Sequence, residues 1–99
     1  MTDLCREINE FGKGIGNKSR YRILEVLLKG PKTVGGLVEI IDLSQPAVSQ
    51  HLKTLRGSGL VLDERHGREV FYSVNTEYLL GLLKSLSDQV KKKKKRKRA

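Results

Sequence analysis

The side chains best suited to binding another molecule lie between residues 43 and 62, in the segment LSQPAVSQHLKTLRGSGLVL. Val48, Leu52 and Leu55 are spaced four and then three residues apart, which predicts one apolar stripe along a helix. Polar and cationic side chains project away from that stripe or flank it, namely Gln45, Ser49, Gln50, Lys53 and Arg56. Amides, hydroxyls and cations can bond base edges and phosphates, so the pattern favours a helix that reads nucleic acid. An amphipathic helix with a solvated polar face is the alternative.

The residues around this segment indicate where the helix begins and what precedes it. Ser44 is a suitable N-cap, Pro46 is tolerated in a first turn, and the Gly-Ser-Gly run at residues 57–59 ends the helix. A shorter apolar stripe over residues 34–41 predicts another helix just before it. Because so few residues separate the two helices, we expect them to cross steeply as a helix-turn-helix.

Two strand-like runs, residues 60–65 and 68–74, follow the predicted reading helix. In the second run Val70, Tyr72 and Val74 alternate with Phe71 and Ser73, so the first three are expected to face inward. His66-Gly67 marks a tight turn and would place Arg65, His66 and Arg68 at an exposed basic tip. A mainly α fold with about five helices and a small two-stranded hairpin, a winged helix-turn-helix, is therefore predicted. A winged helix can also serve only to dock proteins.

The ends of the chain carry apolar stripes that favour a dimer. Residues 21–28 are apolar around most of a helix, which predicts a buried central element. The stripes at the two ends comprise Leu4, Ile8, Phe11, Leu79, Leu82, Leu83, Leu86 and Val90. A domain of this size has little core left to cover them, so we expect them to lie between two subunits, with packing inside one subunit as the alternative. A twofold dimer would hold two reading helices about 34 Å apart on a near-palindromic site.

The net charge of +9 is concentrated at one end of the chain. The 99 residues suffice for one domain, and residues 91–98 are eight consecutive Lys and Arg. Without these eight, 12 Lys and Arg remain against 11 Asp and Glu. We therefore predict a nearly neutral domain over residues 1–90 and a disordered basic tail over 91–99, or at most a frayed extension of the last helix. The tail is expected to bind nucleic acid without sequence preference; a solubilising role, an RNA or anionic-membrane contact and a nuclear-localisation look-alike remain alternatives.

Several classes of function find no support in the sequence. No apolar run approaches the roughly 20 residues that span a bilayer, and the polar start is no signal peptide, so a cytosolic protein is expected. Cys5 is the single cysteine, which excludes a disulfide within the chain. No catalytic arrangement stands out, because Ser49 and His51 would point about 160° apart on one helix at 100° per residue. We predict no enzyme and no cofactor.

From about Phe11 to Val90 the chain resembles the ArsR/SmtB family of bacterial and archaeal winged-helix repressors. The resemblance rests on RYRILEVLLKG, VGGLVEIIDLSQPAVSQHLKTLRGSGLV and GREVFYSV. It implies five helices with a two-stranded wing, a homodimer joined by its first and last helices, and repression until an inducer weakens DNA binding. It also implies backbone or minor-groove contacts by residues 65–68. The side chains that it would place in the major groove are Ser44, Gln45, Ser49, Gln50, His51 and Lys53. For His51 a packed, neutral imidazole remains the alternative.

The metal-binding motifs of that family are missing here. Many members have Cys-Val-Cys or Cys-Val-Gly at the start of the third helix, where this chain has KTVGG at residues 32–36. The ligand positions on the last helix correspond to Thr76, Tyr78, Gln89 and Lys92, which are not usual metal ligands in this setting. The sequence thus predicts a prokaryotic, nucleoid-associated transcriptional repressor that binds double-stranded DNA as a homodimer. It is expected to act without metal, and its inducer is unknown. The alternative is an architectural protein that coats nucleic acid through its tail.

Overall fold

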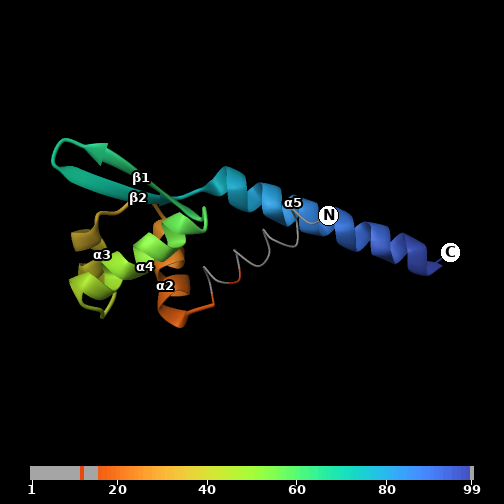
Figure 1. Ribbon diagram of the computed structural model, residues 1–99, viewed down its shortest axis with the longest axis horizontal. Coiled ribbons are helices and arrows are strands. Elements are labelled where there is room, and N and C mark those ends of the chain that lie inside the picture. Colours follow the sequence, from red (N-terminus) through yellow and green to blue (C-terminus); the bar gives the residue numbers. More distant parts are fainter. Residues whose placement is uncertain (1–11, 13–15, 99) are drawn as a thin grey trace.

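Figure 1 shows the computed structural model, in which three short helices and a hairpin pack together and a long last helix extends away from them. The structure describes residue 12 and residues 16–98, with side chains as far as residue 92. The helices and strands there are α2 (Lys18–Leu27), α3 (Val34–Ile40), α4 (Gln45–Gly57), β1 (Val61–His66), β2 (Glu69–Val74) and α5 (Thr76–Arg98).

The mainly helical fold with a two-stranded hairpin agrees with the sequence prediction, but the number of helices does not. About five helices were expected, whereas the described part of the chain has four. The single cysteine, Cys5, and the apolar stripe predicted near the start of the chain, Leu4, Ile8 and Phe11, lie outside the described residues.

Three polar side chains determine where the short helices begin. Asn17 Oδ1 accepts from the backbone N–H groups of Ser19 and Arg20, at 2.8 and 3.2 Å, and so caps α2. Thr33 Oγ1 accepts from Gly36 N at 3.0 Å and caps α3. Ser44 caps α4, as predicted, with Pro46 in its first turn.

The short helices enclose one apolar core. A link of four residues joins α3 to α4, and Ile41 within it is buried. The side chains with less than 2% of their surface exposed are Ile23, Leu37, Val48, Leu52, Leu55, Leu60 and Val61. Burial of one such side chain contributes about 1.5–3 kcal/mol, so this cluster fixes the helix-turn-helix pair against α2 and the base of the hairpin.

The hairpin is antiparallel and pairs Val61 with Val74 at its base and His66 with Glu69 at its end. Gly67 at the turn has φ +66°, a conformation that favours glycine, as the His-Gly signal predicted. Val74 is buried and Tyr72 packs against the core, which confirms the predicted inward direction of this side of the strand. Lys32 pairs with β2 as an isolated antiparallel bridge, in which its backbone exchanges hydrogen bonds of 3.0 and 2.8 Å with Tyr72.

Helix α5 begins beside the hairpin and continues to Arg98. Residues 91–98, which were expected to be disordered, are thus helical. This agrees with the second expectation, that the basic segment extends the last helix. The domain boundary at residue 90 stays a prediction. Among the described residues, none of the helices combines the length and apolar character needed to cross a bilayer.

Candidate nucleic-acid interface

Helix α4 exposes a continuous polar side, which we call the reading face. It consists of Gln45, Ser49, Gln50, Lys53 and Arg56, all of which are exposed. On the opposite side Val48, Leu52 and Leu55 are buried in the core. The backbone that carries the reading face is therefore held by close packing, as a helix that presents hydrogen-bonding groups to a groove must be.

Ser44 lies at the end of the reading face and caps the helix. Its Oγ accepts from Ala47 N at 3.3 Å, so the hydroxyl oxygen already has a partner within the helix. Pro46 has no N–H and Ala47 N is already bonded, so the first turn leaves the N–H of Gln45, together with the Ser44 hydroxyl hydrogen, to donate to a phosphate. Its contact with DNA stays a prediction.

His51 lies on another side of α4 from the reading face. The side chain is partly buried, and its Nδ1 atom is buried with no hydrogen-bond partner among the described residues. Burial, and secondly the positive charge of Arg20 on α2, lower the pKa of His51 below its ordinary value. These features favour the packed, neutral imidazole over a base contact.

Arg56 ends the reading face and is joined to the hairpin by an ion pair. Its Nη1 donates to Oδ2 of Asp63 on β1 at 2.9 Å, and the side chains of Arg56 and Asp63 are 54% and 34% exposed. Sequence reasoning missed Asp63, because a strand carboxylate seven residues after Arg56 meets it only once the chain has folded back. The contact connects the reading helix directly to the wing.

The basic tip of the hairpin divides between the two faces of the sheet. Successive side chains of a strand point to opposite faces, so Arg65 shares a face with Asp63, and His66 shares the other with Glu64. Arg65 Nε donates to the carbonyl of Gly67 at 3.2 Å, which holds the side chain over the turn. Arg68 is exposed in the turn itself. Arg65 is thus on the face of the wing that contacts α4.

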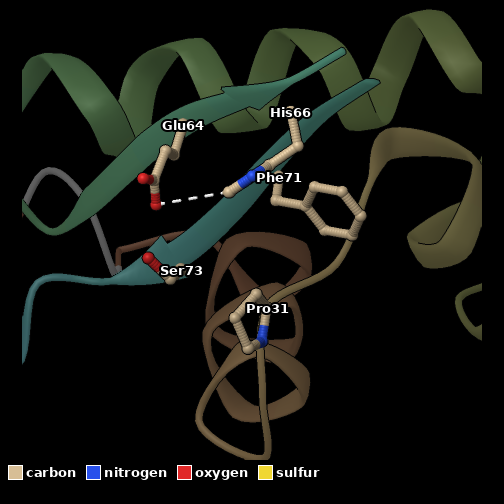
Figure 2. A pocket seen from close by; sticks show the side chains of 5 residues that line it. All are labelled: Pro31, Glu64, His66, Phe71 and Ser73. Carbon is tan, nitrogen blue, oxygen red and sulfur yellow. Dashed lines mark ion pairs between the residues drawn. The ribbon is translucent and has the colours of Figure 1, made fainter. Parts of the chain in front are cut away.

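Figure 2 shows the other face of the hairpin, where His66 lies between Glu64 and Phe71. His66 Nε2 is 3.5 Å from Glu64 Oε1, and its ring meets Phe71 edge-on with centroids 5.6 Å apart. With Pro31 and Ser73, these side chains line an open hollow of about 470 Å³. His66 is therefore directed away from Asp63 and Arg65, which weakens its candidacy as a DNA contact.

The predicted dimer residues of α5 fall into two groups. Leu79 packs against the core of its own chain, and Leu82 is only 5% exposed. Leu83, Leu86 and Val90 are 49%, 41% and 59% exposed, and the sequence analysis missed Leu80, which is 65% exposed. Within the described part of α5, the apolar side chains available to a second subunit are these four, while Leu79 and Leu82 are already covered within a single chain.

No three His, Cys, Asp or Glu side chains within the described ranges come together as a metal site would require. At the start of α3, the Thr33 side chain caps the helix and the Lys32 backbone pairs with Tyr72.

Comparison with known proteins identifies the helix-turn-helix region. Residues 17–62 match the family described as "Bacterial regulatory protein, arsR family". The transcriptional repressor SdpR of Bacillus subtilis is 35% identical over 72 residues, which are 73% of this chain and 80% of SdpR. The chain belongs to the ArsR family.

Solved structures extend this likeness to the whole fold. HlyU of Vibrio cholerae is 33% identical with a TM-score of 0.73, over 91% of this chain and 97% of that one. An ArsR-like regulator from Rhodococcus, 22% identical, has the same fold with a TM-score of 0.86 over 97% of this chain and 88% of its own. Of several other curated relatives the chain spans between 44% and 64% of the length.

Membership of the ArsR family determines the class of activity. The chain is a DNA-binding transcriptional regulator and not an enzyme, as the sequence predicted.

Proposed function

We propose that this ArsR-family protein represses transcription as a homodimer on a near-palindromic operator. The observation that carries the proposal is the reading face, a row of exposed amide, hydroxyl and cationic side chains on a helix whose other side is buried in the core. Amides and cations at such positions can bond base edges in the major groove. Arg65 and Arg68 on the wing would bind the DNA backbone beside it.

The sign of regulation is inferred from similarity. SdpR is named a transcriptional repressor, whereas HlyU of Vibrio cholerae is named a transcriptional activator. A promoter fused to a reporter, with and without the protein, decides between the two. We expect lower expression when the protein is present.

The exposed leucines of α5 support pairing of two chains. Leu80, Leu83, Leu86 and Val90 would otherwise leave apolar surface in water, and a second subunit would cover it. A twofold pair would present its reading faces about one DNA turn, roughly 34 Å, apart. Sedimentation at micromolar concentration should show a dimer, and a monomer both with and without DNA would contradict this part of the proposal.

We further propose that the regulator works without metal and acts at the bacterial nucleoid. The start of α3 has Lys32 and Thr33 in structural roles and offers no thiolate. Titration with a divalent metal should leave DNA binding unchanged. Release from the operator at one equivalent of metal per subunit would refute metal independence.

Selection of bound duplexes from random DNA tests the proposal as a whole. We expect a near-palindromic consensus, whereas no enrichment would support the architectural alternative. On the selected site, Gln50→Ala should lower discrimination against mismatched sites by about 1–3 kcal/mol. Arg68→Ala serves as the matched variant, because loss of a phosphate contact should weaken all sequences equally. If Gln50→Ala also weakened all sequences equally, the reading face would be wrongly assigned.

A further inference from the structure

The ion pair between Arg56 and Asp63 lies where the reading helix meets the wing. Arg56 occupies the last turn of α4, and Asp63 lies on β1, on the face that Arg65 shares. Both side chains are partly exposed, and an ion pair in such surroundings adds little to stability. The ion pair instead affects the orientation of the Arg56 side chain and the local charge around it.

The geometry leaves Arg56 able to bind a second anion. A guanidinium carries five N–H donors in a planar fork, and the contact at 2.9 Å occupies Nη1. The other nitrogens can still donate to a phosphate, but only from the direction that Asp63 imposes. The carboxylate also offsets the positive charge, so this corner of the interface attracts phosphates weakly at a distance.

We propose that Asp63 is a positioning residue for DNA recognition. It orients Arg56 so that the guanidinium meets a backbone phosphate only in the register set by the reading face, and it suppresses binding of Arg56 to DNA in other registers. Asp63 thereby lowers non-specific affinity and raises the ratio of specific to non-specific binding. This inference rests on the proposed function, since it presumes that the reading face contacts DNA.

Glu64 provides a matched control for Asp63. It is the next residue of the same strand, carries the same charge and is exposed, but it points to the opposite face with His66 and Phe71 (Figure 2). Asp63→Asn and Glu64→Gln therefore change the net charge equally. Any difference between the two variants reports the position of the carboxylate.

The experiment measures the affinity of the full chain for a selected duplex and for a random-sequence duplex of the same length, at several salt concentrations. We expect Asp63→Asn to bind the random duplex about 3- to 10-fold more tightly at low salt and to lose about 5-fold in the specificity ratio. The slope of log K against log salt should steepen by about one phosphate contact per subunit, roughly 1.8 for the dimer. Glu64→Gln should leave the slope and the ratio unchanged.

Two further variants separate positioning from a merely structural effect. Asp63→Glu should restore most of the specificity ratio, because it keeps a carboxylate near Arg56. In an Arg56→Ala background, Asp63→Asn should change neither the ratio nor the salt slope, since no guanidinium remains to be freed. A loss of folding alone would not steepen a salt slope.

The outcomes distinguish this inference from the proposed function. The role of Asp63 would be overturned if Asp63→Asn and Glu64→Gln changed the specificity ratio and the salt slope equally. It would also be overturned if Asp63→Asn changed them as much in the Arg56→Ala background as in the unmodified protein. Equal binding of the selected and random duplexes by the unmodified protein would instead overturn sequence-specific recognition. The salt slope on random DNA would then still decide whether Asp63 restrains Arg56.

Discussion

Asn75 joins the end of the wing to the start of α5, and its replacement is the most informative test of the fold. Its Nδ2 donates to the carbonyl of Gly59 at 3.1 Å, and its Oδ1 accepts from Tyr78 N at 3.2 Å. The first bond ties α5 to the loop after α4, and the second caps α5. One amide thus acts both as donor and as acceptor.

The expected loss of unfolding free energy follows from these two hydrogen bonds. Asn75→Ala removes the cap, worth about 1 kcal/mol, and the bond to Gly59, also about 1 kcal/mol, so we expect a loss near 2 kcal/mol. Asn75→Asp keeps the acceptor and removes only the donor. Its cost should be about 1 kcal/mol, because a carboxylate still caps α5 but faces the carbonyl oxygen of Gly59.

Asn17 supplies the control, because it caps α2 through its acceptor alone. Asn17→Ala should cost about 1 kcal/mol, whereas Asn17→Asp should remain within about 0.5 kcal/mol of the unmodified protein. The assay is urea unfolding followed by circular dichroism at one fixed protein concentration, since pairing of chains would make stability depend on concentration. If aspartate were tolerated as well at position 75 as at position 17, the bond to Gly59 would carry no weight and the reasoning would fail.

Four further expectations concern the wing, α4 and the basic segment. Leu60→Ala should cost about 2–5 kcal/mol because Leu60 is 0% exposed, whereas Leu62→Ala, at a site that is 50% exposed, should cost less than about 1 kcal/mol; thermal unfolding compares them. Gly67→Ala should cost about 1–2 kcal/mol in urea unfolding, from the backbone alone, because φ is +66° and the added methyl group meets nothing within 4 Å. Since burial lowers the pKa of His51 in the folded state, the unfolded chain binds protons first as the pH falls, so the free energy of unfolding should decrease as the pH falls through about 6.5. The contribution of His51 to this decrease should be absent in His51→Gln. If His51→Gln and the unmodified protein showed the same dependence of stability on pH, the assignment to His51 would be wrong. Removal of residues 91–98 should weaken binding equally across sequences and flatten the salt dependence in a filter-binding assay, whereas loss of sequence discrimination would contradict the assignment.

Local sequence patterns were sufficient to predict most of the winged helix. The buried stripe of α4, its Ser44 cap and the turn at Gly67 each depend on residues close together in the chain, and the structure confirms all three. Such features follow from helix periodicity, capping and glycine conformation, which a single sequence displays. The reading face could be predicted for the same reason, because it is the complement of the buried stripe.

Features that depend on folding could not be predicted in this way. The contact of Asp63 with Arg56 and the pairing of Lys32 with Tyr72 join residues that no periodic pattern connects. The same limitation explains α5, where periodicity grouped Leu79 with exposed leucines although Leu79 packs on the core. A stripe shows which residues share a side of a helix, but not which part of that side its own chain covers.

The distribution of charge suggests how affinity and selectivity are divided within the chain. Outside residues 91–98 the sequence has almost no net charge, so attraction to DNA must come from individual placed cations. On DNA bound outside the register of the reading face, where Asp63 restrains Arg56, the cations left at the interface are Lys53, Arg65 and Arg68. Three phosphate contacts per subunit would there give a dimer a salt slope of roughly −5, a modest value that leaves discrimination to the reading face. Basic residues beyond the domain can then raise affinity for DNA of any sequence without disturbing which site is chosen.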